Sequence, residues 1–229
     1  DARQATFGTL YVATVGKIRM LSQRLANAAQ QASQGNPAAF AQLRESREKF
    51  ALLLGQLSSG GEVNGVSVPA SPDDVRPRLD ALSQRWEMTD KDAQTVLAQE
   101  KNLVALGKSV ALIDDKNAVM LELTEQLAAL KLQGGASSRD IVAANQLAML
   151  TQRIAKNASA LLVGDEINPE VAFLLGKDTN VFRDILQNLG KAGGDGDAKQ
   201  KMEELGKIFG EYQEAVGNIL GNMQPLVLS

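Results

Sequence analysis

The chain has 229 residues, of which 44% are hydrophobic, 22% are charged and 4% are aromatic, and it contains neither cysteine nor histidine. Without these two residue types the common zinc sites, histidine-ligated haem, disulfides and histidine-activated nucleophiles are excluded, so we expect no metal, no cofactor and no enzymatic activity. The net charge of −3, from 24 basic and 27 acidic residues, is too balanced for a protein that binds nucleic acid.

The sequence contains no uninterrupted apolar run of about 18 residues, so we expect no segment that spans a bilayer. It starts at Asp1 without a methionine, which suggests a soluble segment of a longer protein. The lack of cysteine suits an intracellular protein and equally a bacterial periplasmic protein that avoids stray disulfides. Composition alone leaves both compartments open.

Apolar residues recur at helical spacing along nearly the whole chain, for example at Ile18, Leu21 and Leu25. Clusters of Gly, Pro, Asn and Ser interrupt this spacing and mark the turns. The predicted helices, in chain order, cover residues 3–34, 37–58, 72–98, 101–133, 138–163, 168–190 and 196–222. Helices of about 30 residues are about 45 Å long and need partners to bury their apolar stripes. We therefore expect an all-α protein built of elongated, four-helix-bundle-like units.

A seven-residue motif occurs twice, because Met20–Ala26 (MLSQRLA) returns as Met149–Ala155 (MLTQRIA). After a three-residue insertion the matched pairs are Phe50 with Phe182, Leu53 with Ile185 and Leu57 with Leu189. The third helices also correspond, with Trp86 matching Phe209 and Leu97 matching Leu220. Such self-similarity indicates that a unit of four helices was duplicated. We expect a first unit at residues 1–135 and a second at residues 136–229. The second lacks its fourth helix, which implies that the full-length protein continues.

The first copy of the motif lies in Gly16–Arg24 (GKIRMLSQR), which resembles the conserved helix of the PilJ-type and NarX/NarQ-type bacterial sensor domains. The resemblance to the PilJ type extends over nearly the whole chain. It implies an all-helical, periplasmic signal-input region of a methyl-accepting chemoreceptor for type IV pilus twitching motility, held in the inner membrane as a dimer. NarX-type sensors bind nitrate between two copies of a first-helix arginine, and the resemblance gives that role to Arg19.

The residues around Arg19 support a ligand site on independent grounds. Beside the core stripe, the helix has a second face made of Val12, Val15, Gly16, Ser22, Ala26 and Ala29, on which Arg19 is the only charge. If this face meets its symmetry mate across a two-fold axis, the two guanidinium groups repel unless a planar oxyanion lies between them. The alternative is that Arg19 extends into solvent or pairs with a carboxylate of a neighbouring helix.

We interpret four other polar residues of the motif as structural: Gln23 and Arg24 in the first copy, and Gln152 and Arg153 in the second. The two arginines lie on a different side of the helix from the Arg19 position, and we expect each to form a buried hydrogen bond or ion pair within its unit. The alternative is that these arginines contact a ligand. Ser22 can offer its hydroxyl to the anion or bond a carbonyl of its own helix. Because Ala148 takes the place of Arg19 in the second copy, we expect no second anion site.

Two functions remain as hypotheses. The first is a periplasmic sensor module of a membrane-anchored chemoreceptor, which forms a homodimer and binds a small anion such as nitrate. The second is a module that binds another protein, for example a pilin subunit, without any small-molecule ligand. A large exposed apolar patch on the folded module favours the second hypothesis.

Overall fold

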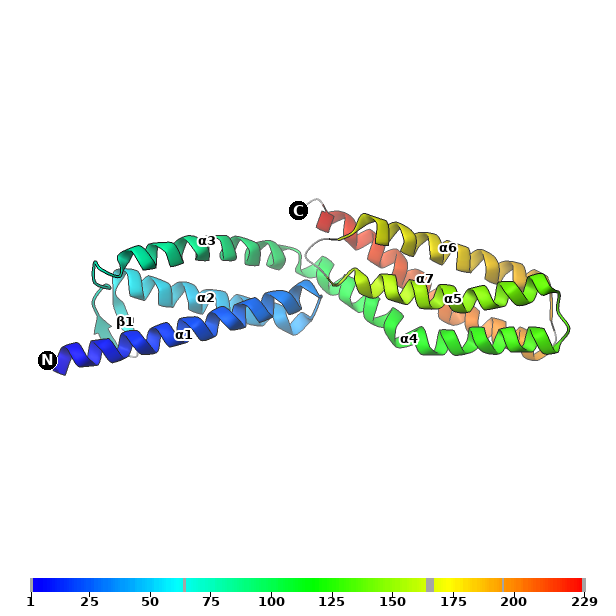
Figure 1. The fold of residues 1–229 in the computed structure, drawn as a ribbon, viewed down its shortest axis with the longest axis horizontal. Helices are drawn as coiled ribbons and strands as arrows, with labels where there is room; N and C mark the ends of the chain where they lie inside the picture. The colour runs from blue at the N-terminus through cyan, green and yellow to red at the C-terminus, as the bar shows by residue number, and fades with distance from the viewer. Residues whose placement is uncertain (1, 64, 164–166, 195, 228–229) are drawn as a thin grey trace. The chain divides into compact units, whose positions relative to one another are not determined.

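The computed structural model describes residues 2–63, 65–163, 167–194 and 196–227. The helices and strands of these residues are α1 (Ala2–Ser33), α2 (Pro37–Ser59), β1 (Gly61–Val63), β2 (Val66–Val68), α3 (Arg76–Ala98), α4 (Glu100–Gln133), α5 (Ser138–Ala160), α6 (Pro169–Lys191) and α7 (Gly196–Val227) (Figure 1). The predicted all-α class is confirmed. Most helix ends agree closely with the prediction, although α5 ends at 160 rather than 163 and α7 continues to 227 rather than 222.

The helices α2 and α6 begin in the same way, with an asparagine followed by a proline. The Asn36 side chain accepts a hydrogen bond from the Ala38 amide at 3.2 Å, and Asn168 accepts one from the Glu170 amide at 2.9 Å. The following proline suits the first helical turn, where its missing N–H is not needed. Gly35, with a φ of 81°, reverses the chain before the first of these caps. Local sequence therefore determines where both helices start.

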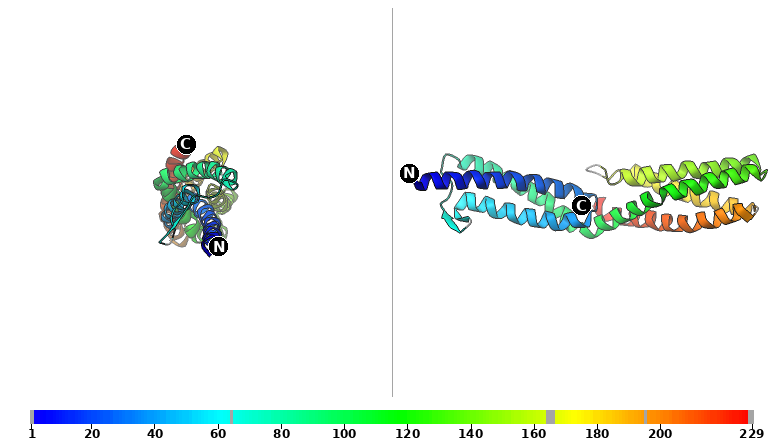
Figure 2. Two further views of the ribbon diagram at one scale, coloured as in Figure 1. Left: turned by 90° about the vertical axis from the view of Figure 1, so that its left-hand side faces the viewer. Right: turned by 90° about the horizontal axis from the view of Figure 1, so that it is seen from below.

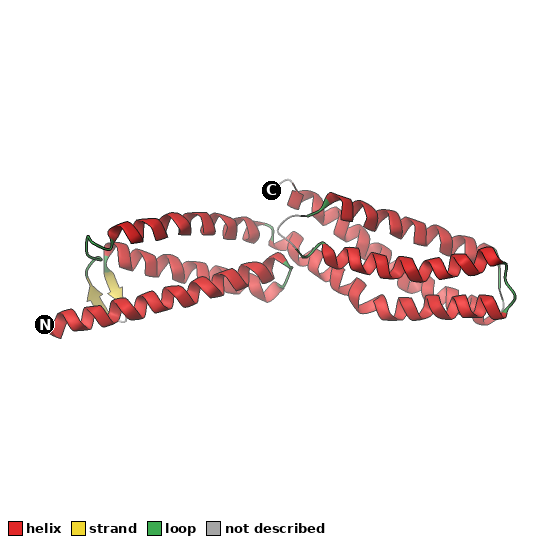
Figure 3. Ribbon diagram, viewed as in Figure 1, coloured by secondary structure: helices red, strands yellow, loops and turns green. Residues whose placement is uncertain are grey.

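A short hairpin between α2 and α3 departs from the prediction, which placed a loop there. The strands β1 and β2 pair antiparallel with Gly61 opposite Val68 (Figure 3). Strands of three residues are too short to show an alternating pattern, so the sequence did not reveal them. After the hairpin, the Ser71 hydroxyl donates to the Leu57 carbonyl at 2.6 Å, and α3 begins at 76 rather than 72.

Unit 1 (Asp1–Lys101) contains α1, α2, the hairpin and α3. The helices α1 and α2 lie side by side in every view (Figure 2). One hydrophobic cluster of this unit consists of Ile18, Leu21, Phe50, Leu54 and Leu57, against which Leu53, Leu79, Leu82 and Trp86 pack. Leu25, Phe40 and Leu43 of the same unit are buried as well. An ion pair between Arg47 and Asp90 also joins α2 to α3, and the hydrogen bond raises the pKa of that arginine.

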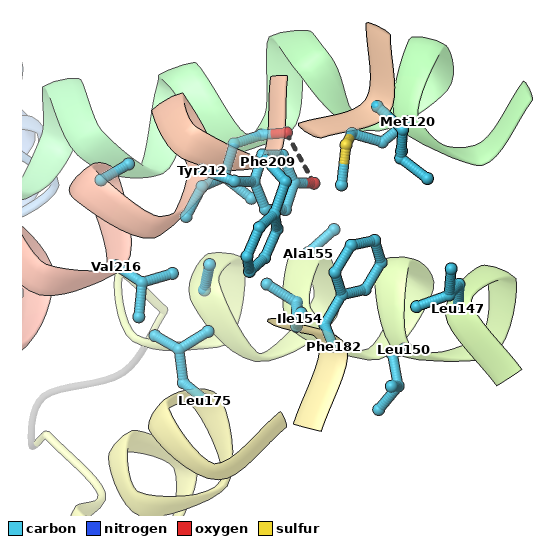
Figure 4. Close-up of a cluster of buried hydrophobic side chains, with 14 of the residues drawn as sticks. Met120, Leu147, Leu150, Ile154, Ala155, Leu175, Phe182, Phe209, Tyr212 and Val216 are labelled. Carbon is cyan, nitrogen blue, oxygen red and sulfur yellow. Dashed lines mark hydrogen bonds between the residues drawn. The ribbon is translucent and has the colours of Figure 1, made fainter. Parts of the chain in front are cut away.

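Unit 2 (Asn102–Ser229) is a bundle of α4, α5, α6 and α7 around one core (Figure 4). The apolar residues Leu106, Ile113, Met120 and Leu127 recur at heptad spacing along α4, and all of them are buried in this core. Tyr212 of α7 is fully buried, its hydroxyl donates to the Ile113 carbonyl at 3.2 Å, and burial raises the pKa of its phenol. The helix α4 therefore belongs to unit 2.

This packing corrects the expected domain boundary. The repeat-based division placed the fourth helix in a first unit ending at residue 135 and left the second unit without one. The structure divides the chain between Lys101 and Asn102, so α4 packs with α5, α6 and α7. The physical reason is the buried apolar stripe of α4, which contributes to the second core rather than to the first.

An aromatic pair occupies the same place in each unit. Phe50 stacks on Trp86 with ring centroids 4.4 Å apart, and Phe182 stacks on Phe209 at 4.6 Å, with an interplanar angle of 22° in both pairs. The sequence repeat matches Phe50 with Phe182 and Trp86 with Phe209, so matched residues make matched contacts. This agreement supports a duplicated unit of three helices, α1–α3 and α5–α7, with α4 added to the second.

Candidate functional site

One face of α1 is exposed to solvent over much of its length. Val12 is 74% exposed and Val15 is 50% exposed. Gly16, Ser22 and Ala26 on the same face are also exposed. The opposite side of the helix is buried against α2 and α3. The helix is therefore two-sided, and no described element of unit 1 covers the second face predicted from the sequence.

Arg19 and Ser22 lie together on this exposed face of α1. Within the described part of the chain, neither side chain makes an ion pair or a hydrogen bond. The described residues thus include no carboxylate of a neighbouring helix that pairs with Arg19, which was the alternative prediction. Both predicted ligand residues are free to contact a molecule from outside the chain.

The matching face of α5 in unit 2 is covered. Ala144 and Thr151, which match Val15 and Ser22, are 0% exposed, and the Thr151 hydroxyl donates to the carbonyl of Leu147 at 2.8 Å. These positions belong to or adjoin the core that α5 shares with α4, α6 and α7. A helix face that unit 2 buries is therefore left open in unit 1.

The second arginine of the motif behaves differently in the two units. In unit 2, the Arg153 guanidinium donates two hydrogen bonds to the carboxylate of Asp178 on α6, one of them from Nε to Oδ2 at 2.8 Å. These bonds to the carboxylate raise the pKa of Arg153. Asp178 is 1% exposed. In unit 1, Arg24 makes no ion pair with any described residue, because the position that matches Asp178 is Ser46. We expected a pair in each unit, and the structure shows one in unit 2 alone.

A cavity of about 400 Å³ lies beside Arg24, between α1 and α2. Its polar lining consists of Arg24, Asn27, Gln42, Glu45, Ser46 and Lys49. Glu45 accepts a hydrogen bond from Lys49 at 2.7 Å, and its pKa is lowered first by that bond and the charge of Lys49 and then by the charge of Arg24. Ser46 is 6% exposed, and its hydroxyl makes no hydrogen bond with a described residue.

The structure brings together only some of the residues that the sequence singled out. Gln23 and Gln152 are exposed and contact neither arginine site, so the structural role expected for them has no support among the described contacts. Asp178 and Ser46 were missed. The repeat that matches Phe50 with Phe182 also matches Ser46 with Asp178, and this was the signal that could have found them.

The sequence is similar to sequences of known proteins. Residues 2–112 match the PilJ family, described as the N-terminal domain of the type IV pili methyl-accepting chemotaxis transducer. The chain carries a PilJ-type domain. It is 26% identical to Protein PilJ of Pseudomonas aeruginosa over 225 residues, which cover 95% of the chain and 33% of that protein. The chain thus spans about a third of the length of this relative.

Residues 2–112 are thus similar to the N-terminal domain of type IV pilus chemotaxis transducers. The family match covers α1, α2, the hairpin, α3 and the first part of α4, and therefore includes both the exposed α1 face and the cavity beside Arg24. None of the helices, as far as the described residues go, is long and apolar enough to cross a membrane.

Proposed function

We propose that this chain is the periplasmic signal-input region of a membrane-anchored type IV pilus chemoreceptor, and that it works as a homodimer through the exposed face of α1. The observation that carries the proposal is the exposure of Val12 and Val15 around an unpaired Arg19. Exposed valines in a row along one helix face are typical of a surface that packs against a partner. The matching face of α5 is buried within its own unit, which supports a packing role for this side of the helix.

The partner proposed for this face is a second copy of the chain. A two-fold axis along α1 brings Val15 against Val15 and lets the small residues Gly16 and Ala26 accept close helix contact. It also brings the two Arg19 side chains together. Their repulsion is relieved when a planar anion such as nitrate accepts hydrogen bonds from both guanidinium groups, with Ser22 within one helical turn.

Signalling in this proposal is a change in packing. The anion favours the dimer arrangement in which the two Arg19 side chains converge, and it shifts the equilibrium only by its difference in affinity for the two arrangements. Small shifts between packed helices are a common way to carry such a signal toward a membrane. No catalytic step is required.

The dimer is tested by sedimentation of the purified chain and two matched variants. Val15→Glu places two carboxylates in the proposed interface, and we expect it to weaken the dimer at least about tenfold, the effect of losing one strong interface contact. Val142→Glu makes the same change on α5, at a site that is 62% exposed and outside the interface, and should leave the dimer intact. Equal behaviour of both variants contradicts the proposed interface.

The anion site is tested by thermal unfolding with nitrate, nitrite, sulfate and chloride at one ionic strength. A ligand at 100 times its Kd stabilises the folded state by about 2.7 kcal/mol, which moves the midpoint by a few degrees. The shift should disappear in Arg19→Ala and persist in Arg85→Ala, which removes an exposed arginine of α3. A nitrate shift that survives in Arg19→Ala excludes Arg19 as the site.

A second candidate function, recognition of another protein such as a pilin subunit, is favoured by exposed apolar side chains of unit 2. Phe173 of α6 is 68% exposed, and Val163, close after α5, is 75% exposed. A direct binding assay with purified pilin and the Phe173→Asp variant tests this function. Binding that the variant abolishes, together with no effect of any anion, favours the protein-sensing function over the anion-sensing one.

A further inference from the structure

The matching arginines Arg24 and Arg153 differ in their partners, because only Arg153 pairs with a described carboxylate of its own unit. The difference indicates where unit 1 can accept a carboxylate from outside. In unit 2, the carboxylate of Asp178 is buried between α5 and α6 and is held by both donor groups of the Arg153 fork. In unit 1, Arg24 occupies the matching position, but Ser46 replaces the aspartate. The shorter side chain leaves the arginine without a carboxylate from its own unit.

The surroundings of Arg24 are those of a recessed polar site. The cavity of about 400 Å³ is lined by Ser46, a residue that is 6% exposed and whose hydroxyl makes no hydrogen bond with a described residue. Because Ser46 lines the cavity, its hydroxyl can donate a hydrogen bond to a ligand there. The amides of Asn27 and Gln42 line the same cavity and offer further donors and acceptors.

The charge balance of the cavity favours an anion. Its charged residues are Arg24, Lys49 and Glu45, with a net charge of +1. Glu45 does not take the place of Asp178, because it lies one residue earlier on α2, its side chain is 65% exposed, and it is already bonded to Lys49. Arg24 therefore has the charge and the fork geometry for a carboxylate, and although its charge acts on Glu45, it forms no ion pair with a described carboxylate.

We propose that unit 1 binds the carboxylate of a small organic acid between α1 and α2, in the position that Asp178 fills in unit 2. Arg24 holds the carboxylate through its forked N–H groups, the Ser46 hydroxyl donates to one of its oxygens, and Asn27 and Gln42 contact the rest of the ligand. This site deepens the proposed sensor function, on which it rests, and it is distinct from the anion site at Arg19 because it lies on another side of α1.

The first test measures carboxylate binding to the whole chain by NMR titration and by thermal unfolding. Acetate, lactate and benzoate are the probes, with chloride at the same ionic strength as the reference. Arg24→Ala should weaken binding by about tenfold to hundredfold, the value of a hydrogen bond to a charged group. Arg19→Ala should leave binding unchanged. If none of the three acids binds, or if Arg24→Ala binds them as the natural chain does, the proposed site is wrong.

Two reciprocal variants test the comparison between Ser46 in unit 1 and Asp178 in unit 2. Ser46→Asp gives unit 1 the carboxylate that unit 2 contains, and it should raise the unfolding midpoint and abolish binding of the acids. Asp178→Ser empties the place in unit 2, and the stability it loses should be partly restored by acetate. Binding that persists in Ser46→Asp overturns the proposal, as does a failure of acetate to stabilise Asp178→Ser more than chloride does.

The outcomes separate this site from the anion site of the proposed function. Acid binding that depends on Arg24, with no nitrate effect at Arg19, supports the carboxylate site and contradicts the nitrate site. A nitrate effect that depends on Arg19, with no acid binding, overturns the carboxylate site alone. Loss of acid binding in Arg19→Ala but not in Arg24→Ala also overturns it, because the acid then occupies the α1 face.

Discussion

Unit 2 satisfies with its own residues two requirements that unit 1 leaves open. It covers the face of α5 that matches the exposed face of α1, and it pairs Arg153 with a buried aspartate where Arg24 has none. Both units otherwise share the stacked aromatic pair and the capped second helix. The same helical motif can therefore be buried inside a bundle, as in α5, or remain exposed for binding, as in α1. A few side chains and one added helix make the difference.

The added helix accounts for the first difference. The apolar stripe of α4 supplies the core of unit 2 with Leu106, Ile113, Met120 and Leu127, and the described residues of unit 1 include no helix in the equivalent place. A helix face without such cover exposes apolar area at about 25 cal/mol per Å², so any partner that buries it gains this free energy.

The largest expected effect comes from the aromatic pairs. Phe182→Ala removes a ring that is 0% exposed from the core of unit 2, and we expect a loss of about 3–5 kcal/mol in the free energy of unfolding. Phe50→Ala should cost less, about 2–4 kcal/mol, because its partner Trp86 is only half-buried.

Urea unfolding can follow the two units separately. Trp86 is the single tryptophan and lies in unit 1, so its fluorescence reports on that unit, whereas circular dichroism reports on both. Phe182→Ala should move the dichroism transition more than the fluorescence transition, and Phe50→Ala should do the reverse. Phe173→Ala, at an exposed site of α6, is the control and should change neither. Equal losses from Phe50→Ala and Phe182→Ala contradict the difference between the two cores.

The next effect distinguishes the two arginines. Arg153→Ala leaves the buried carboxylate of Asp178 without its partner, and we expect a loss of about 2–4 kcal/mol, less than for a fully buried pair because the arginine side chain is 47% exposed. Arg24→Ala removes an unpaired side chain and should change stability by less than about 0.5 kcal/mol.

The measurement is again urea unfolding, in buffer free of organic acids, with dichroism as the signal. Arg153→Lys is a useful companion variant, because it keeps the charge but loses the forked hydrogen bonds, and its stability should fall between those of the natural chain and Arg153→Ala. If Arg24→Ala is as destabilising as Arg153→Ala, then Arg24 has a structural partner and unit 1 is closed in the same way as unit 2.

The helices were predictable from the sequence, whereas their grouping was not. Apolar spacing and the Asn-Pro starts mark each helix locally, which is why the predicted ends agree with α2, α4 and α6 so closely. The position of α4 depends on which core its stripe enters, and that is a property of the tertiary packing. The hairpin was missed for the opposite reason, because strands of three residues carry too little pattern.

The candidate site was predictable in part. The face around Arg19 was predicted from the small and apolar residues beside it, because a helix with two apolar faces can pack against its own unit with only one of them. The partner of Arg153 did not follow from the motif, because the seven matched residues end before α6 begins. Finding the partner of Arg153 required the alignment of α2 with α6, in which Ser46 matches Asp178.

The smallest expected effect concerns the buried hydroxyl of Tyr212 in unit 2. Tyr212→Phe keeps the buried ring and removes the hydrogen bond to the Ile113 carbonyl at 3.2 Å, so we expect a loss of about 0.5–1.5 kcal/mol. The matching residue of unit 1 is the exposed Thr89, and Thr89→Val should change stability by less than about 0.5 kcal/mol. The loss in Tyr212→Phe should appear in the dichroism transition and leave the Trp86 fluorescence transition in place. A shift of both transitions by the same amount shows instead that the two units unfold together, and the stability comparison between them then applies to the whole chain rather than to each unit.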